Sequence, residues 1–261
     1  MDGIDGRVPP SAPEITTGQA NRVWSVEGPT PYILKHYGDP SRAANEAAAL
    51  RLLARHRAPA PQLLAASSDS STLPWTAQAA LHAKPVPIDR FLADLAEPLA
   101  SIHRIPGTHF GRLAGAQKHR SWTGYLHDRL RTYAVAAPAL RAVARRLHQE
   151  VEASIDAIQP ALLHHDLQPG HLLREPAGSQ MLIDWELATF GDHRSDLARL
   201  AVRLDLDDPT QMLALVSRPD AAAEDRLHLY WRIHLLADAA LSTDRAVRER
   251  AVGRLLASSV T

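Results

Sequence analysis

The sequence of 261 residues contains no cysteine. This absence excludes disulfide bonds and thiolate metal sites, and it fits a reducing compartment. The sequence also lacks any run of about 18 uninterrupted apolar residues, the length that a membrane-spanning helix needs. Its first residues carry neither a basic patch nor an apolar stretch, so no secretory signal is expected. We therefore predict a cytoplasmic protein without a membrane partner.

The sequence has no excess of charge of either sign. Lys plus Arg and Asp plus Glu number 29 each, so no overall field attracts nucleic acid or an anionic surface. Aromatic residues are few, at 5%, but 45% of the residues are hydrophobic, which suffices for a folded core. The composition indicates a globular protein whose partners are small molecules rather than nucleic acid.

The first third of the chain has the pattern of a small β-rich region around one helix. Asp39 followed by Pro40 is typical of a helix start, with an acidic N-cap and proline at the first helical position. Alternating or β-rich segments bounded by turn residues predict the strands. The expected elements are strands near residues 22–26, 31–35, 63–66 and 75–79, and a helix over residues 41–55.

The rest of the chain is mainly helical in pattern. Asp89 and Ser121 are expected to cap helices, and Pro138 is expected to open another. Further helices are predicted over residues 226–241 and 244–256. We therefore divide the chain into a flexible arm (1–13), a β-rich N-lobe (14–83) and a helical C-lobe (84–261), with residues 84–87 as the linker.

Two acidic motifs carry the strongest chemical signal. The run His164-His165-Asp166 follows one short apolar segment, and Asp184 follows another, Met181 to Ile183, eighteen positions beyond Asp166. We expect the two segments to pair as a ribbon that presents both carboxylates to one pocket. Phosphoryl transfer uses such a pair, because one carboxylate orients the attacking hydroxyl and the other holds a divalent cation against the phosphates.

These motifs resemble those of the aminoglycoside phosphotransferase and choline-kinase-like family, relatives of the protein kinases. His164 and Asp166 match its His-Gly-Asp loop, and Ile183-Asp184-Trp185 matches its metal-binding segment. Gly191-Asp192 and Asp196-Leu197-Ala198 match the Gly-Asp-Pro-x-x-Asp-Leu-Ala run that follows. The resemblance implies an α+β, bilobal, protein-kinase-like fold with a five-stranded N-lobe sheet. It also implies that Asp166 is the catalytic aspartate, Asp184 binds the metal, and His164 and Asp196 support the loop.

The resemblance extends upstream, in the same order as in the family. Thr17 to Trp24 is similar to the family's phosphate-covering turn, which assigns Gly18 and Asn21 to the nucleotide. Lys35 ends a predicted strand where the family keeps the lysine that touches the phosphates. Glu46, eleven residues on, falls on the apolar stripe of the predicted helix. A carboxylate buried there needs a cation, and Lys35 is the expected partner.

Position 171 departs from the family, because it is His where the family has a metal-binding Asn. Mg²⁺ prefers oxygen ligands, whereas imidazole suits transition metals better. His171 therefore leaves three readings open: no contact with metal, a ligand that shifts preference towards Mn²⁺, or lost activity in a nucleotide-binding pseudokinase. His165, where the family has Gly, adds bulk beside the catalytic acid.

The sequence predicts a kinase that moves the terminal phosphoryl group of ATP or GTP, with Mg²⁺, onto a hydroxyl of a small molecule. By resemblance, the acceptor is an antibiotic, either an aminoglycoside or another hydroxyl-bearing type, and the outcome is resistance. A metabolic kinase for choline, a sugar or an amino alcohol is the alternative. A zinc hydrolase built on the histidines near Asp166 is disfavoured, because their spacing is unlike helical ligand pairs and Lys35 and Glu46 stay unexplained.

Overall fold

The computed structural model describes residues 4–15, 21–68, 73–155, 157–215 and 223–258 of the chain. Two compact units divide it, and each gathers segments that are distant in sequence. Unit 1 comprises residues 1–105, 112–116 and 169–188, and unit 2 comprises residues 106–111, 117–168 and 189–261. The predicted lobes 14–83 and 84–261 are contiguous in sequence, whereas these units are not. The lobe boundaries stay a prediction.

A four-stranded antiparallel sheet in the order β1-β2-β4-β3 opens unit 1. Its strands are β1 (Asn21–Val26), β2 (Tyr32–Tyr37), β3 (Leu63–Ala66) and β4 (Trp75–Ala79). Trp24, Val26 and Leu34 form its buried cluster, against which Val8, Ala12 and Trp75 pack. The predicted strands are confirmed within a few residues. The prediction of five strands is wrong among the described residues, because the next strand joins another sheet.

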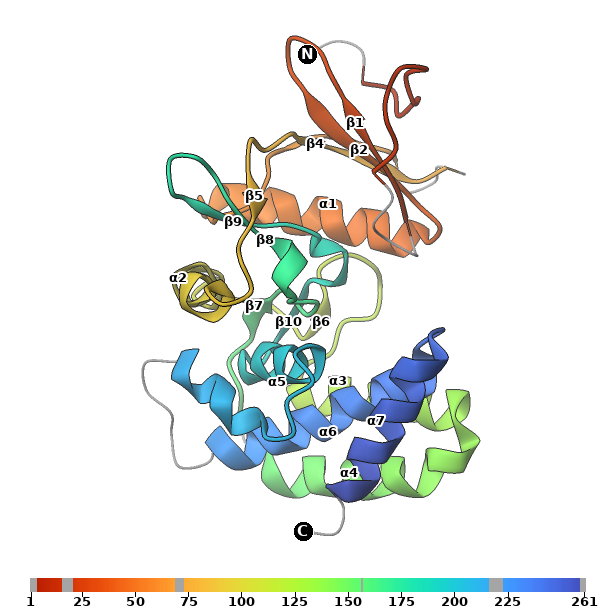
Figure 1. Cartoon of the computed structure of the whole chain (residues 1–261). Helices are drawn as coiled ribbons and strands as arrows, with labels where there is room; N and C mark the ends of the chain where they lie inside the picture. The colour runs from red at the N-terminus through yellow and green to blue at the C-terminus, as the bar shows by residue number, and fades with distance from the viewer. Residues whose placement is uncertain (1–3, 16–20, 69–72, 156, 216–222, 259–261) are drawn as a thin grey trace. The chain divides into compact units, whose positions relative to one another are not determined.

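Helix α1 (Pro40–Arg55) follows β2 and packs on the sheet (Figure 1). The Asp39 side chain accepts a hydrogen bond from the Ser41 backbone N–H, and Pro40 occupies the first turn, as predicted from the sequence. The buried face of α1 carries Leu50 and Leu53 together with two polar residues, Asn45 and Glu46. These two residues put an amide and a carboxylate on the inner side of the helix.

A second, three-stranded sheet in unit 1 has the order β5-β8-β9. It consists of β5 (Lys84–Pro85), β8 (Leu172–Arg174) and β9 (Gln180–Leu182), with α2 (Phe91–His103) packed against β9. The segment predicted as a linker thus begins with a short strand. Leu172 lies opposite Leu182, so the β8–β9 hairpin brings the residues before β8 beside those after β9.

The predicted ribbon between the two acidic motifs is wrong. Strand β7 (Ala161–Leu163) pairs with β10 (Thr189–Gly191), whereas β9 pairs with β8. Tight packing fixes the β7–β10 pair: a Cβ at Gly191 would lie 2.4 Å from the Trp122 ring and 2.9 Å from Leu163. A larger residue would have to displace the Trp122 indole. The two acids therefore follow strands of different sheets.

Helices form most of unit 2. They are α3 (Trp122–Ala136), α4 (Arg141–Ser154), α5 (Arg194–Arg203), α6 (Ala223–Leu241) and α7 (Arg245–Ala257), with short 3-10 turns η1 (Pro138–Leu140) and η4 (Pro209–Leu215). The remaining short strand, β6 (Gly111–Arg112), joins β10. Helix α6 contacts α3, α4, α5 and α7 (Figure 1). It is the central helix of this unit.

Of the two helix caps predicted after α1, Asp89 and Ser121, only Ser121 is confirmed. Ser121 caps α3 by accepting from the Gly124 N–H, and Asp244 caps α7. Asp89 does not cap α2, which begins at Phe91 after Arg90 without a side-chain cap. The helix that Pro138 was expected to open is split into η1 and α4, which ends at Ser154. No helix among the described residues is long and apolar enough to cross a membrane.

Candidate active site

Lys35 lies at the centre of a buried ion cluster in unit 1. Its Nζ is 2.9 Å from Glu46 Oε2 and 2.5 Å from Asp184 Oδ1. Glu186 Oε2 lies 3.7 Å from the same nitrogen. Burial disfavours the charge on Lys35, but Glu46, followed by Tyr37 and Asp184, outweighs burial and holds the pKa of Lys35 well above its ordinary value. The ammonium group is therefore charged and fixed in direction.

Glu46 is the fully buried anchor of this cluster. Besides Lys35, its carboxylate accepts a short hydrogen bond from the Tyr37 hydroxyl and one of 3.1 Å from the Trp185 N–H. Burial, and then the carboxylate of Glu46, raise the pKa of Tyr37 well above its usual range, so the phenol stays protonated and donates. The sequence prediction that Glu46 pairs with Lys35 is confirmed.

Asp184 is placed by the β8–β9 hairpin. His171 ends the turn η2 (Pro169–His171) just before β8, and the Ile183 N–H donates to its carbonyl at 3.0 Å. Asp184 comes next along the chain, so its Oδ2 lies 3.4 Å from His171 Nε2. Its backbone has φ 69° and ψ 63°, the left-handed region. Asp tolerates this conformation better than bulky residues do, and such strain is concentrated at functional sites.

Glu186, in the turn η3 (Trp185–Leu187), completes the acidic cluster. Arg42 Nη1 donates to its Oε1 at 2.7 Å, and the Asn21 amide donates to its Oε2. Burial raises the pKa of Glu186, and Lys35 opposes that effect. Asn45 clamps the same turn to α1, because its amide donates to the carbonyls of Glu186 and Ala188. Three acids thus surround one lysine in a network of hydrogen bonds.

The loop that holds Asp166 lies in unit 2 and is braced by Asp196. The two carboxylate oxygens of Asp196 accept hydrogen bonds from the backbone N–H groups of His164, at 2.9 Å, and His165, at 2.6 Å. Asp196 is fully buried in the first turn of α5. The imidazole of His164, also fully buried, accepts from the Asp166 N–H through Nδ1 at 3.3 Å. Both supports act on the backbone and leave the Asp166 carboxylate to other partners.

The carboxylate of Asp166 forms an ion pair with Arg203, at the C-terminal end of α5. Arg203 Nη2 lies 2.7 Å from Asp166 Oδ1, and the two side chains are 31% and 13% exposed. The pair is therefore open to solvent on the arginine side. Arg203 is a contact that the sequence motifs did not predict.

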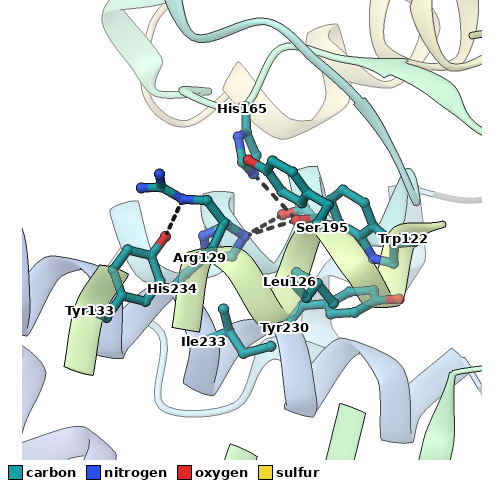
Figure 2. Close-up of a pocket in the computed structure, with 10 residues that line it drawn as sticks. Trp122, Leu126, Arg129, Tyr133, His165, Ser195, Tyr230, Ile233 and His234 are labelled. Carbon is teal, nitrogen blue, oxygen red and sulfur yellow. Dashed lines mark hydrogen bonds between the residues drawn. The ribbon is translucent and has the colours of Figure 1, made fainter. Parts of the chain in front are cut away.

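An aromatic pocket borders the same loop within unit 2 (Figure 2). It encloses about 270 Å³, part of which is open to solvent. His165 Nε2 lies 3.4 Å from Ser195 Oγ, and Arg129 Nε donates to the Tyr133 hydroxyl at 3.3 Å. His165 has φ 67°, the left-handed conformation that glycine adopts without strain, which explains the glycine at this position of the resembled family. The remaining lining residues are Trp122, Tyr125, Leu126, Tyr230, Ile233 and His234.

A model of the phosphotransferase enzyme family matches residues 11–230. The chain belongs to this family. The match covers both acidic motifs and the Lys35–Glu46 pair. It identifies the protein as an enzyme that transfers phosphoryl groups to small molecules. No protein with curated annotation matches the sequence significantly.

Solved structures of aminoglycoside phosphotransferases and putative fructosamine-3-kinases show the fold. A thermostable mutant of aminoglycoside phosphotransferase APH(4)-Ia matches with a TM-score of 0.73 at 20% identity, over 95% of this chain and 93% of that one. A putative fructosamine-3-kinase from Thermobifida fusca matches with a TM-score of 0.66 at 21% identity, over 96% and 94%. One from Haemophilus somnus matches with a TM-score of 0.67 at 15% identity, over 94% and 90%. The predicted α+β, kinase-like fold is confirmed.

The phosphotransferase motifs divide between the two units. Lys35, Glu46, His171 and Asp184 lie in unit 1, and the loop of Asp166, with its braces His164 and Asp196, lies in unit 2. Asn21 contacts Glu186, whereas Gly18 lies outside the described residues. Sequence reasoning missed Glu186, Asn45 and Arg203 as members of these clusters. Glu186 stands two positions after Asp184 in the motif, so this spacing could have indicated that it joins the cluster. Arg203 stands in no motif, so the sequence held no signal for its contact with Asp166.

The acidic cluster of this phosphotransferase has the donors that a divalent cation needs. Glu46, Asp184 and Glu186 each offer a carboxylate oxygen within 4.8 Å of the others. Hard oxygen donors suit Mg²⁺, and the nearby His171 nitrogen adds a donor that Mn²⁺ accepts more readily. Lys35 already balances part of the negative charge. The residues therefore fit a divalent metal near Asp184.

Unit 2 of the phosphotransferase contains a buried neutral histidine, which makes its stability depend on pH. Burial, followed by the charge of Arg199, lowers the pKa of His234 from 6.5 to about 3. Its Nε2 lies 3.1 Å from the Ser195 carbonyl, which only accepts, so Nε2 carries the proton and donates. Because the unfolded chain takes up a proton below pH 6.5 and the folded chain does not, stability contributed by this residue is lost as the pH falls.

We expect this residue to remove about 1.4 kcal/mol of the free energy of unfolding per pH unit between pH 6.5 and about 3. Urea unfolding at several pH values, with wild type and His234→Gln compared, measures the effect. The glutamine keeps an amide donor but does not titrate, so its dependence on pH should be shallower. Equal slopes for both proteins would contradict a neutral His234.

Proposed function

We propose that this kinase moves the terminal phosphoryl group of ATP or GTP onto a hydroxyl of a small molecule, with Asp166 as the base. The observation that carries the proposal is the buried Lys35–Glu46–Asp184 cluster, because it fixes a charged ammonium group beside the carboxylate of Asp184, which we propose as the metal ligand. Ternary complexes of APH(4)-Ia mutants contain AMP-PNP or ADP with hygromycin B, and a mutant of aminoglycoside 2'-phosphotransferase-IIIa contains GDP. These relatives support a purine nucleotide as the phosphoryl donor.

In the proposed mechanism, Lys35 holds the nucleotide phosphates and Glu46 holds Lys35. The ammonium group neutralises negative charge on the phosphate oxygens and sets their position, and positioning and electrostatics supply most of the catalysis in phosphoryl transfer. The turn around Asn21 is proposed to lie over the same phosphates, as is Gly18 by its place in the motif. Glu46 acts only through Lys35 and is a positioning residue.

Asp184 is proposed to hold the divalent cation, with His171 as a further donor and Glu186 close by. When bound, Mg²⁺ would neutralise charge on the terminal phosphates. The left-handed backbone at Asp184 and the His171 carbonyl that anchors Ile183 fix the direction of this carboxylate. His171 decides the choice between Mg²⁺ and Mn²⁺ if its nitrogen is a ligand.

Asp166 is proposed to align the acceptor hydroxyl and to take its proton as the bond to phosphorus forms. The brace of Asp196 on two successive backbone amides and the contact from His164 hold the loop rigid. Preorganisation of this kind lowers the barrier, because little reorganisation remains for the transition state. Arg203 shares the Asp166 carboxylate and so limits the directions from which an acceptor approaches.

For the acceptor, we propose a hydroxyl-bearing antibiotic, by likeness to the aminoglycoside phosphotransferases, with antibiotic resistance as the outcome. A metabolic acceptor is the second candidate, because putative fructosamine-3-kinases match at a similar TM-score and identity. A pseudokinase that binds nucleotide without transfer is the remaining alternative, because His171 replaces the family's Asn. A panel of antibiotics, sugars and amino alcohols, incubated with ATP or GTP and Mg²⁺ or Mn²⁺, separates the three by mass spectrometry of the phosphorylated product. Failure of every acceptor with both metals would favour the pseudokinase.

Replacing His171 by asparagine tests its part in metal binding. If the imidazole is a ligand, His171→Asn should shift metal preference from Mn²⁺ towards Mg²⁺, because an amide oxygen replaces a nitrogen donor. Nucleotide affinity measured against the concentration of each metal reports the shift even without an acceptor. His103→Asn, a histidine in α2 outside the cluster, is the control. An unchanged metal profile would show that His171 touches no metal.

A further inference from the structure

A hollow lined by arginines lies among α5, α6 and α7 of unit 2. It encloses about 480 Å³, part of which is open to solvent. Leu235, Val247 and Ala251 supply apolar wall, and Arg203, Arg250 and Arg254 supply guanidinium groups. The hollow thus combines apolar wall with charged groups, which can orient an ionic ligand.

The hollow adjoins the proposed base through a shared residue. Arg203 lines the hollow, and its Nη2 also donates to Asp166 Oδ1 at 2.7 Å. A ligand that touches the Arg203 guanidinium therefore lies within a side chain's length of the carboxylate. All of these residues belong to unit 2, so the relation holds within one compact body.

The charges in the wall do not cancel. Asp238 faces Arg199 at 2.7 Å, and Asp205 faces Arg254 Nη1 at 2.9 Å, so each acid of the wall already has a cationic partner. The exposed side chain of Arg250 forms no hydrogen bond or ion pair among the described residues, although it lines the hollow. A guanidinium group without a partner in a concave, partly apolar site favours an anion, with which it pairs through two hydrogen bonds.

We propose that this hollow binds the acceptor and that Arg250 recognises an anionic group on it. The inference rests on the proposed function, because it names the acceptor class of the same reaction. The acceptor is a hydroxyl compound with an apolar body and a carboxylate or similar anion. A polycationic acceptor such as an aminoglycoside is disfavoured, because its ammonium groups would lie beside Arg203 and Arg250 without an unpaired carboxylate in the wall.

Three hydroxyl compounds of the same shape and different charge test the recognition. Mandelate, mandelamide and phenylethanolamine share a phenyl ring and a secondary hydroxyl, and carry a negative, no and a positive charge. Titration calorimetry at low ionic strength should rank their affinities in that order. We expect mandelate to bind about tenfold more tightly than mandelamide, because a hydrogen bond to a charged group is typically worth that factor. Added salt should reduce the difference.

The variant Arg250→Gln should weaken mandelate about tenfold and leave mandelamide unchanged, because only the ionic contact is removed. Arg245→Gln is the matched control, since Arg245 is on the same helix, pairs with Glu249 and lies outside the hollow. The proposal is overturned if mandelate does not bind at millimolar concentration, if the cationic probe binds most tightly, or if both variants behave alike.

Phosphoryl-transfer assays separate this inference from the proposed function. If aminoglycosides are phosphorylated in a reaction that needs Asp166 but not Arg250, the kinase proposal stands and the anionic acceptor is wrong. If the probes bind in the expected order but wild type and Asp166→Ala transfer phosphate equally, the base assignment fails and the charge preference of the hollow stands. For a phosphorylated anionic acceptor, KM should rise in Arg250→Gln while kcat changes little.

Discussion

Asp166→Ala is expected to abolish phosphoryl transfer while nucleotide affinity stays unchanged. A positioned base contributes about 10²–10⁴-fold to the rate, and the same carboxylate aligns the acceptor, so the loss of turnover should reach at least this range. Nucleotide affinity is assigned to Lys35 and Asp184 of unit 1, which this change does not alter. Product formation by mass spectrometry and nucleotide binding by calorimetry measure the two effects.

Asp225→Ala is the control for this experiment. Asp225 is an exposed acid near the start of α6 and takes no part in the Asp166 loop. Because Arg203 loses its partner in Asp166→Ala but stays partly exposed to solvent, the fold should persist, and thermal unfolding checks that it does. Turnover equal to wild type in a folded Asp166→Ala protein would refute the assignment of the base.

Glu46→Ala is expected to damage both stability and activity. The change leaves the buried donors of Lys35, Tyr37 and Trp185 without the carboxylate that accepts from them. Because each orphaned buried donor costs about 1–3 kcal/mol, the free energy of unfolding should fall by about 3 kcal/mol or more. Urea unfolding measures this loss, and Glu97→Ala, an exposed acid on α2, should stay near the wild-type value.

Glu46→Gln separates the two effects if the alanine variant does not fold. The amide oxygen still accepts from the Trp185 N–H and the side-chain volume is kept, so more stability is retained than in the alanine variant, but the charge that holds Lys35 is gone. We expect weaker nucleotide binding and turnover at least tenfold lower, because the ammonium group is no longer fixed for the phosphates. Full activity in this variant would show that Glu46 does not position Lys35.

Local rules explain which features could be predicted. The Asp39-Pro40 start of α1 and the Ser121 cap of α3 depend on residues within four positions of each other, and both are confirmed. The inward position of Glu46 follows from helical periodicity. Because a buried carboxylate needs a cationic partner, the contact with Lys35 could be predicted. Asp89 shows the limit of such rules, because an acid near a helix start need not cap it.

Partners between distant segments could not be predicted in this way. The predicted ribbon is wrong because the sequence of a short apolar strand does not specify which other strand it pairs with. Packing between Gly191 and Trp122 favours the β7–β10 pair. Arg203 reaches Asp166 across 37 positions, and Arg250 enters the same hollow from another helix. Neither arginine stands in a motif, so only their positions in the folded chain connect them with the reaction.

The sequence by itself determined the family, the helix starts, and the side chains able to hold phosphate, metal and a proton, because these depend on residue type and short spacing. The tertiary structure decided which acids Lys35 contacts, how Asp196 braces the loop, and that arginines line the hollow beside Asp166. Those relations depend on closing long loops around a packed core. The entropy lost on closing those loops is offset by contacts made throughout the whole unit, so these relations cannot be predicted from any one segment of the sequence.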